Sequence, residues 1–224
     1  RITLPAGCAG MTARCLVITQ RWASERVQWG HPIGHHAAVA DKLASMAADD
    51  FALRSTVLYV SSLVDADKNA DVRLEAAIAK LWGTETAWRI IDDTMQIRGG
   101  RGFETAQSLA AHGERPEPVE RFFRDARINT IFEGSSEIMR LFIAREVLDP
   151  HLKVGAAVVN PTLPAKQRLK AALRAARFYA AWYPAKWLPT GAGDSASHIH
   201  PSLQGDLHAI HHLLRHCSRI PSRH

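Results

Sequence analysis

One carboxylate is notable because of the residues on either side of it. Glu133 follows the apolar pair Ile131 and Phe132 and precedes Gly134, in the segment IFEGSSEIMRL. The apolar neighbours can partly desolvate the carboxylate, the glycine lets the backbone bend, and the paired serines are typical of a helix start. A carboxylate in such surroundings can act as a general base. The plainer interpretation, an acid at a loop end near a helix N-terminus, stays open on these residues alone.

A glycine-rich segment, QIRGGRGF, is a second candidate for chemistry. Its Gly100 and Gly102 could begin a dinucleotide-binding fingerprint. They follow a helical pattern instead of a strand, however, and Thr105 stands where the third glycine belongs. The segment therefore does not predict a Rossmann site.

Histidines near the end of the chain form a third candidate. Their spacing on one side of a possible helix could suit a metal ion, but neither an acid nor a cysteine completes the set. We therefore expect solvated histidines and no metal. The residues are His208, His211, His212 and His216.

Three long helices are expected to position these residues. Apolar residues recur at spacings of three and four; glycines near 30–34 separate the first segment from the second, and glycines at 99–102 end the third. No segment alternates with a period of two, so the sequence predicts an all-α, antiparallel up-down bundle. The stripes are Leu4, Cys8, Met11, Cys15, Ile18 and Trp22; Val39, Leu43, Met46, Leu53, Val57, Val60 and Val64, interrupted by Asp50; and Leu74, Ile78, Leu81, Trp88, Ile91 and Met95.

The rest of the chain is expected to hold loops and shorter helices. Residues 101–118 indicate a loop, 119–125 a short helix, and 135–148 a helix that ends at Asp149 and Pro150. We therefore assign 1–150 to the bundle and 151–224 to a linker and partial helical extension. A basic helix in the extension could dock on a membrane surface or a partner, or could be an ordinary helix with a solvated basic face. Its apolar face is Leu169, Leu173, Ala176, Ala180 and Tyr183, flanked by Lys166, Arg168, Lys170, Arg174 and Arg177.

The composition limits the size of the core, the charge of possible partners and the role of the cysteines. With 224 residues and 46% hydrophobic content, the chain can form one sizeable core plus an extension. A net charge of +6 suits an anionic partner without choosing among a nucleotide, a coenzyme, nucleic acid or an acidic membrane. Three cysteines are too few for a disulfide scaffold, so we expect reduced core cysteines. The first residues resemble neither a signal peptide nor a translation start, which suggests that the chain begins within a longer protein.

Four ordered segments resemble the acyl-CoA dehydrogenase family. Phe132 to Ser135 match its catalytic loop, aromatic-Glu-Gly-Thr/Ser. ERVQWG at 25–30 matches Glu-Arg-x-x-Phe-Gly, and QIRGGRGF at 96–103 matches Gln-Ile-x-Gly-Gly-x-Gly-aromatic. VERFFRDARI at 119–128 precedes the catalytic loop at the family's spacing. The resemblance runs to about residue 149, and 151–187 are less specifically similar to the extension of very-long-chain members.

The resemblance implies an FAD-dependent α,β-dehydrogenation of acyl-CoA in fatty-acid β-oxidation. Glu133 would take the α-proton, while its backbone amide and a flavin ribityl hydroxyl polarise the thioester carbonyl. Substrate contacts are implied at Arg1 and Gly134, and a mainly structural ion-pair role at Arg124, Asp125 and Arg127. Gln96, Gly99 and Gly100 would reach the cofactor of a neighbouring subunit. Cofactor contacts are implied at Arg26, Gln28, His36, Gln96, Gly99, Gly100, Ser135 and Glu137.

The sequence departs from the family at two positions. Ala37 stands where glutamine is frequent, and Phe132 where tyrosine is frequent. One cofactor contact is therefore lost at Ala37, while the neighbouring His36 still matches.

The resemblance also implies partners. These are an acyl-CoA substrate, electron-transfer flavoprotein as electron acceptor, and a homodimer or homotetramer, in bacterial cytoplasm or the mitochondrial matrix. An acyl-CoA oxidase, a DNA-binding member and a non-catalytic oligomerisation module are the alternatives. Dispersed basic residues disfavour nucleic acid, and the intact Glu133-Gly134 pair disfavours a silent module. Without the portions that hold the flavin ring, the isolated chain is expected to be inactive.

Overall fold

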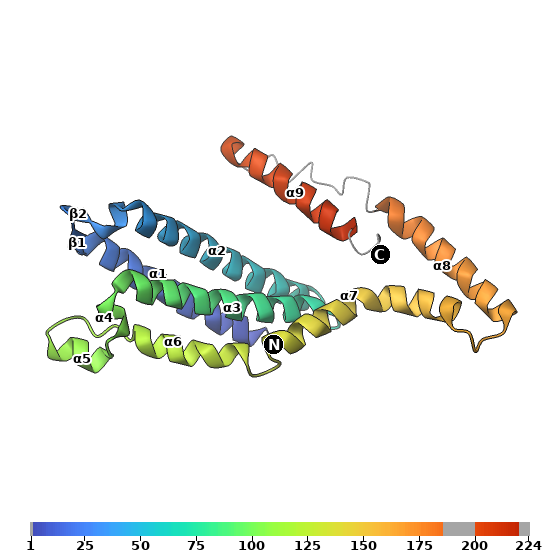
Figure 1. Ribbon diagram of the computed structural model, residues 1–224, viewed down its shortest axis with the longest axis horizontal. Coiled ribbons are helices and arrows are strands. Elements are labelled where there is room, and N and C mark those ends of the chain that lie inside the picture. The colour runs from blue at the N-terminus through green and yellow to red at the C-terminus, as the bar shows by residue number, and fades with distance from the viewer. Residues whose placement is uncertain (1, 186–199, 220–224) are drawn as a thin grey trace. The chain divides into compact units, whose positions relative to one another are not determined.

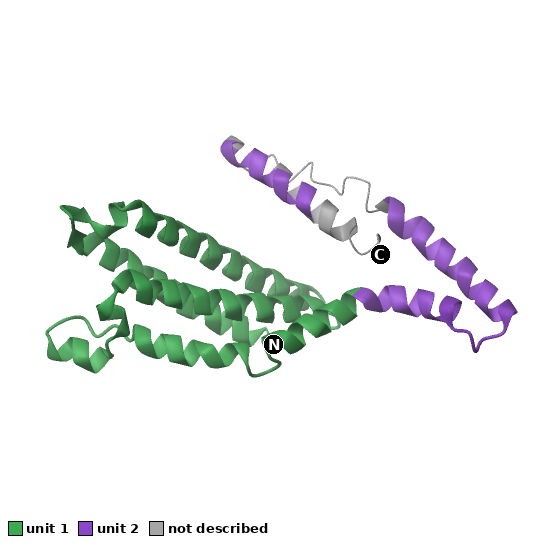
Figure 2. Cartoon of the chain, in the orientation of Figure 1, with its two compact units in different colours: residues 1–147 green, residues 148–224 purple. Residues whose placement is uncertain are grey.

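The computed structural model describes residues 2–185 and 200–219, which fall into two compact units (Figure 2). The first unit spans Arg1–Val147 and the second Leu148–His224. Apart from one two-stranded hairpin, the elements of the described residues are helices. The prediction of an all-α fold is therefore confirmed.

Three long helices form the body of the first unit: α1 (Thr3–Glu25), α2 (Ala37–Ala66) and α3 (Arg73–Arg98). They lie side by side, and each contacts the other two (Figure 1). The predicted stripes of α1 and α2 face the core. Burying this apolar surface, at about 25 cal/mol per Å², is the main term that stabilises the bundle. Fully buried stripe members are Cys8, Cys15, Ile18, Met46, Leu53 and Val60.

The third helix buries its predicted stripe only in part: Ile91 is fully buried, and the other members except Ile78 are half-buried. Ile78, a member of the predicted stripe, is 43% exposed, and the buried face of α3 is mainly alanine and threonine. α3 packs against α1, α2 and α6, so small side chains are needed where these helices approach. A Cβ on Gly83 would lie only 2.8 Å from Leu53 Cδ1 and 3.1 Å from Pro5 Cβ. The three long helices therefore meet closely at Gly83.

The interruption in the α2 stripe is a buried polar link. Asp50 accepts a hydrogen bond of 2.6 Å from the Thr12 hydroxyl of α1 and pairs with Arg54 at 2.5 Å. Because the Asp50 carboxylate has two partners, the cost of burying it is offset. The hydrogen bond from Thr12 also joins α1 to α2.

Two of the cysteines behave as predicted. Cys8 and Cys15 are free and buried. Burial raises the pKa of each thiol to about 11. Neither is therefore a nucleophilic thiolate at neutral pH.

The segment after α3 is more helical than its glycines and prolines indicate. The predicted loop at 101–118 contains α4 (Gly100–Phe103) and α5 (Ala106–Ala111), so that prediction is wrong there. Both helices are too short to show an apolar period, although Thr105 caps α5 by accepting a hydrogen bond from the Ser108 amide. The predicted short helix is present as α6 (Val119–Arg127), followed by the 3₁₀ turn η2 (Ile128–Thr130).

The next helix continues beyond its predicted end. α7 spans Ser136–Val159 and contains Pro150, although we expected it to stop at Asp149 and Pro150. Proline removes one backbone hydrogen bond from a helix. An ion pair of 2.5 Å between Asp149 and Lys153 spans the turn that contains Pro150 and supports the helix there.

In the second unit, α8 (Ala165–Ala185) packs against the end of α7, and η4 (Pro201–Leu203) precedes α9 (Gln204–Arg219). The His151 ring lies 5.0 Å from Trp182 and 5.7 Å from Tyr179, between ring centroids. The predicted apolar face of α8 lies outside this contact. Its Leu169 and Leu173 are 63% and 65% exposed.

Candidate active site

The expected site residues gather at two ends of the first unit. The Glu25–Gly30 turn and the Gln96–Phe103 glycines lie at the end that carries the β-hairpin and α4 (Figure 1). The Glu133 loop lies toward the other end, between η2 and α7. About 27 Å along α3 separates these regions, counted from Lys80 to Arg98 at 1.5 Å per residue.

A tight hairpin shapes the first of these ends. β1 (Val27–Gln28) pairs antiparallel with β2 (His31–Pro32). The two residues between the strands, Trp29 and Gly30, have φ angles of 51° and 84°, the pattern of a type I′ turn. His36 Nε2 lies 3.1 Å from the Gln28 carbonyl oxygen, so the hairpin holds these two expected residues together.

A cleft of about 860 Å³ opens beside the hairpin, and we call it the hairpin-end cleft. Arg26 and Gln28 line it from one side, and Gly99 and Gly100 from the other. Gly99 has a φ of 61°, a conformation that favours glycine and that ends α3. Of the expected cofactor residues on this side, His36 and Gln96 do not line the cleft.

Ion pairs connect the walls of the cleft. The buried carboxylate of Glu117 accepts from Arg14 at 2.8 Å and from Arg21 at 3.4 Å. Arg101 pairs with Glu114 at 2.7 Å. These pairs tie the segment before α6 to α1 and α4.

At the other end, the backbone of the Glu133 loop is in an unusual conformation. Glu133 and Gly134 have φ angles of 55° and 105°, both in the left-handed region. The fully buried Lys80 donates a hydrogen bond of 2.6 Å from Nζ to the Gly134 carbonyl. The core helix α3 therefore holds the loop through a buried ammonium group. A Cβ on Gly134 would lie 2.5 Å from Met139 Cε, so glycine fits both the space and the backbone angle.

The expected desolvation of Glu133 is not present within this chain. The Glu133 side chain is exposed, and Phe132 beside it is 40% exposed. The carboxylate is therefore accessible to a ligand, but the described residues do not bury it. Apolar residues next to Glu133 in sequence bury its carboxylate only if other parts of the fold also cover it.

A small pocket of about 320 Å³ lies next to the loop, and we call it the loop-end pocket. Ser135 and Glu137 line it together with Arg127 and Arg140. The pKa of Glu137 lies below its ordinary value because the carboxylate accepts hydrogen bonds from its own backbone amide and from Ser135. The expected cofactor residues are thus divided between two ends of the bundle.

Comparison with known proteins assigns this arrangement to a family. The family model for the C-terminal domain of acyl-CoA dehydrogenases matches residues 1–148. The chain belongs to the acyl-CoA dehydrogenase family.

Several acyl-CoA dehydrogenases are similar to this chain. The probable acyl-CoA dehydrogenase FadE10 of Mycobacterium tuberculosis is 52% identical over 184 residues, which cover 82% of this chain and 28% of that protein. The human mitochondrial very long-chain specific acyl-CoA dehydrogenase is 34% identical over 166 residues, covering 72% of this chain and 24% of that protein. The chain thus spans about a quarter of the length of these relatives.

A solved structure shows the same fold. The acyl-CoA dehydrogenase of Bacillus anthracis, complexed with FAD, superposes with a TM-score of 0.59 and 29% identity. The match covers 68% of this chain and 28% of that one. The helical bundle is therefore the part that this chain shares with acyl-CoA dehydrogenases.

Three expected residues of this acyl-CoA dehydrogenase domain lie on α6. Arg124 pairs with Glu120, and Asp125 pairs with Arg121, as expected for structural ion pairs. Arg127 instead donates a hydrogen bond to Thr130, and its guanidinium lies 5.9 Å from the centre of the Trp88 ring. The ion-pair expectation therefore holds for two of the three.

Sequence reasoning missed a buried arginine in the acyl-CoA dehydrogenase domain. Arg98 is 7% exposed and lines the hairpin-end cleft. Burial lowers its pKa, while the nearby Glu117 and Glu114 oppose this shift. Its spacing from the buried Ile91 and Thr94 on α3 puts it on the same helical face, and that signal could have identified it.

Some expectations fall on residues that the structure does not describe. Arg1 lies outside the described residues, and so do the side chains of His208, His211 and His216. In the described part of the chain, no group of three or more potential ligands could hold a metal ion. No helix in that part is long and apolar enough to cross a bilayer.

Proposed function

We propose that this chain acts as the helical domain of an FAD-dependent acyl-CoA dehydrogenase, with Glu133 as the base that takes the substrate α-proton. The observation that carries the proposal is the Glu133–Gly134 turn, which Lys80 anchors to the core. The accessible carboxylate can accept a proton from a ligand, and the anchored turn fixes the Glu133 amide that would donate to the thioester carbonyl. Gly134 would contact the substrate, as would Arg1.

The hairpin-end cleft fits a nucleotide diphosphate. Arg26 and Gln28 would hold the phosphates, and Gly99 and Gly100 let backbone approach the adenosine half. Gln96 and His36 would support this site from outside the cleft. At the other end, Ser135 and Glu137 would contact the flavin half. When bound, FAD supplies the acceptor for the hydride that leaves the substrate β-carbon.

The separation of the two ends supports an assembly. Within one copy, the hairpin-end cleft and the Glu133 loop lie far apart along α3. A homodimer or homotetramer would let the cleft serve the cofactor of a neighbouring subunit. We propose acyl-CoA as the substrate and electron-transfer flavoprotein as the electron acceptor, with an acyl-CoA oxidase as the alternative.

The test compares this chain with the whole gene product. After mixing with FAD and size exclusion, the chain alone is expected to elute colourless, because it offers contacts to the diphosphate and adenosine but few to the flavin ring. The whole gene product should elute yellow and bleach when acyl-CoA is added without oxygen. A yellow product that no acyl-CoA bleaches would contradict the proposal. Rapid recolouring by oxygen alone would favour the oxidase.

We also propose that α8 docks on an anionic membrane surface. Residues 160–185 contain five basic and no acidic residues, and the leucines of the apolar face are exposed. An exposed apolar stripe flanked by cations is the pattern of an interfacial helix. Each surface cation contributes about 1 kcal/mol at an anionic bilayer.

Charge reversal on α8 tests this membrane proposal. Lys170→Glu combined with Arg174→Glu should reduce co-sedimentation with phosphatidylserine vesicles at least tenfold, because two attractive charges become repulsive. Reversing two cations of α6, Arg121 and Arg124, is the matched control and should change little. Equal sedimentation of wild-type chain and α8 variant would remove the membrane proposal.

A further inference from the structure

Arg98 is a buried cation that opens onto the hairpin-end cleft. The residue is 7% exposed, and its Nε has no hydrogen-bond partner. Arginine stays protonated at neutral pH. The Arg98 guanidinium is therefore a positive charge in a position that water hardly reaches. Burying such a charge is costly unless a partner compensates it. An anion in the cleft would be that partner.

The guanidinium of Arg98 is held by a tryptophan. Arg98 Cζ lies 4.9 Å from the centre of the Trp22 ring, and Arg26 Cζ lies 5.9 Å from the same ring. The Trp22 indole N–H donates to the Ile97 carbonyl at 3.2 Å, which fixes the ring against the end of α3. One indole therefore positions two guanidinium groups, one from each side of the cleft.

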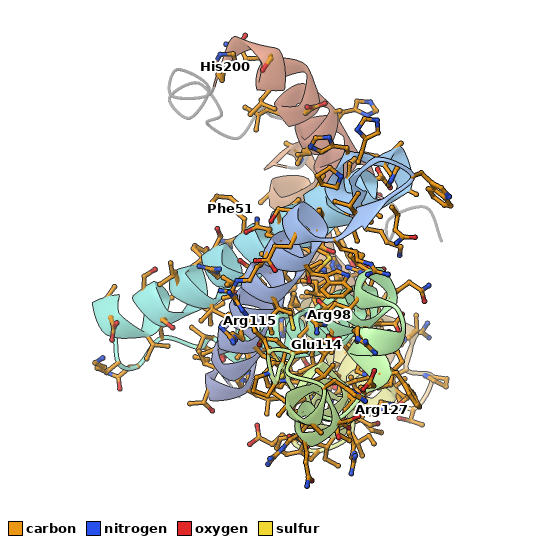
Figure 3. The ribbon with its side chains drawn as sticks, turned by 90° about the vertical axis from the view of Figure 1, so that its left-hand side faces the viewer. Phe51, Arg98, Glu114, Arg115, Arg127 and His200 are labelled. Atoms are coloured by element: carbon orange, nitrogen blue, oxygen red, sulfur yellow. The ribbon has the colours of Figure 1, made fainter. Side chains whose placement is uncertain are left out.

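The charges around the cleft are unbalanced. Five arginines and three glutamates line it. Arg21 and Arg101 pair with Glu117 and Glu114. Across residues 2–185 and 200–219, Arg26, Arg98 and Arg115 have no carboxylate within ion-pair distance. Figure 3, which looks onto this end, shows Arg98 and Arg115 among the elements that surround the cleft.

We propose that Arg98 is a second phosphate-binding residue, which acts together with Arg26 on the diphosphate of a nucleotide cofactor. Two guanidinium groups fixed on one indole match two adjacent phosphates, and arginine can contact each phosphate through two N–H groups. The proposal rests on the proposed function, because it assigns the cleft to the FAD diphosphate. It adds a contact from Arg98, which lies within the QIRGGRGF segment but is not among its implied cofactor residues Gln96, Gly99 and Gly100.

The test measures binding of ADP and inorganic pyrophosphate to this chain by calorimetry. Arg98→Met keeps much of the side-chain volume and removes the charge, and it should weaken both probes about tenfold or more. Arg98→Lys should be intermediate, because a point charge cannot replace the planar fork. Arg121→Met on α6 is the matched control and should bind like wild type.

Thermal unfolding separates a binding role from a structural one. If Arg98 serves the ligand, Arg98→Met should unfold without ligand at the wild-type temperature or higher, because a buried unpaired charge is removed. Wild-type affinity in Arg98→Met, with a loss in Arg26→Met, would overturn the role of Arg98 and leave the proposed function intact. Failure of the wild-type chain to bind either probe would reject the phosphate assignment of the cleft as well.

Discussion

Replacing Glu133 with glutamine is expected to reduce dehydrogenation by the whole gene product at least 10²- to 10⁴-fold, the usual contribution of a general base. Glutamine keeps the shape of the side chain but accepts no proton. The loss should exceed this range if no other group can take the α-proton. The measurement is the rate of flavin bleaching by acyl-CoA in the absence of oxygen.

Substrate affinity should survive this substitution, because Gly134 and the anchored backbone remain in place. Titration of acyl-CoA binding checks that the variant is folded and loaded. Glu120→Gln on α6 is the matched control and should bleach at the wild-type rate. Near-normal bleaching by Glu133→Gln would identify another carboxylate as the base.

Gly102→Ala is expected to destabilise the bundle strongly. A Cβ at this position would lie 2.5 Å from the Met95 carbonyl oxygen and 2.8 Å from its Cα. Because both atoms are backbone, the clash is relieved only by moving the corner between α3 and α4. Overpacking of this kind costs about 3 kcal/mol, which lowers Tm by roughly 6–12 °C for a domain of this size. Circular dichroism during heating measures it.

Gly100→Ala is the control for this substitution. No atom lies within 4 Å of a Cβ at Gly100, so its Tm should stay within about 2 °C of wild type. Equal unfolding temperatures for the two variants would show that the α3–α4 corner can make room for a Cβ at position 102. The corner also positions Gly99 and Gly100 at the cleft, so Gly102→Ala should weaken ADP binding as well.

Lys80 illustrates how the core reaches the proposed base. A fully buried ammonium group is costly, and its hydrogen bond to the Gly134 carbonyl offsets part of that cost. The same bond restrains a loop in which two successive residues have positive φ angles. The packing of α3 and the geometry of the Glu133 loop are therefore linked.

The sequence alone determined the fold class and most helices of the first unit. Apolar spacing is a local property, and a stripe must be buried wherever the helix goes, so Cys15 on α1 and Leu53 on α2 lie in the core as predicted. The apolar stripe is a weaker guide to burial when several helices pack around one helix, as they do around α3. α3 buries Ile91 of its predicted stripe, but most of its buried residues are alanines and threonines, and Ile78 remains exposed.

Local signals also failed where a compensating contact was available. Pro150 predicted a helix end, but α7 continues past it with the support of the Asp149–Lys153 pair. α5 was missed because six residues show no period, although Thr105 provides a cap. A helix-breaking proline or a missing apolar period changes the free energy of a helix by only a few kcal/mol. Contacts with neighbouring residues can offset such a change.

For the site, motifs in the sequence indicated Glu133, Arg26 and the glycines, with roles implied by the family. Only the tertiary structure showed that Arg26 and Gly99 share a cleft, that Trp22 holds Arg98 there, and that the Glu133 carboxylate is exposed within this chain. The physical reason is that helical period specifies which face of a helix is apolar. It does not specify which loop meets which helix end, because contacts between residues distant in sequence depend on how the three long helices pack.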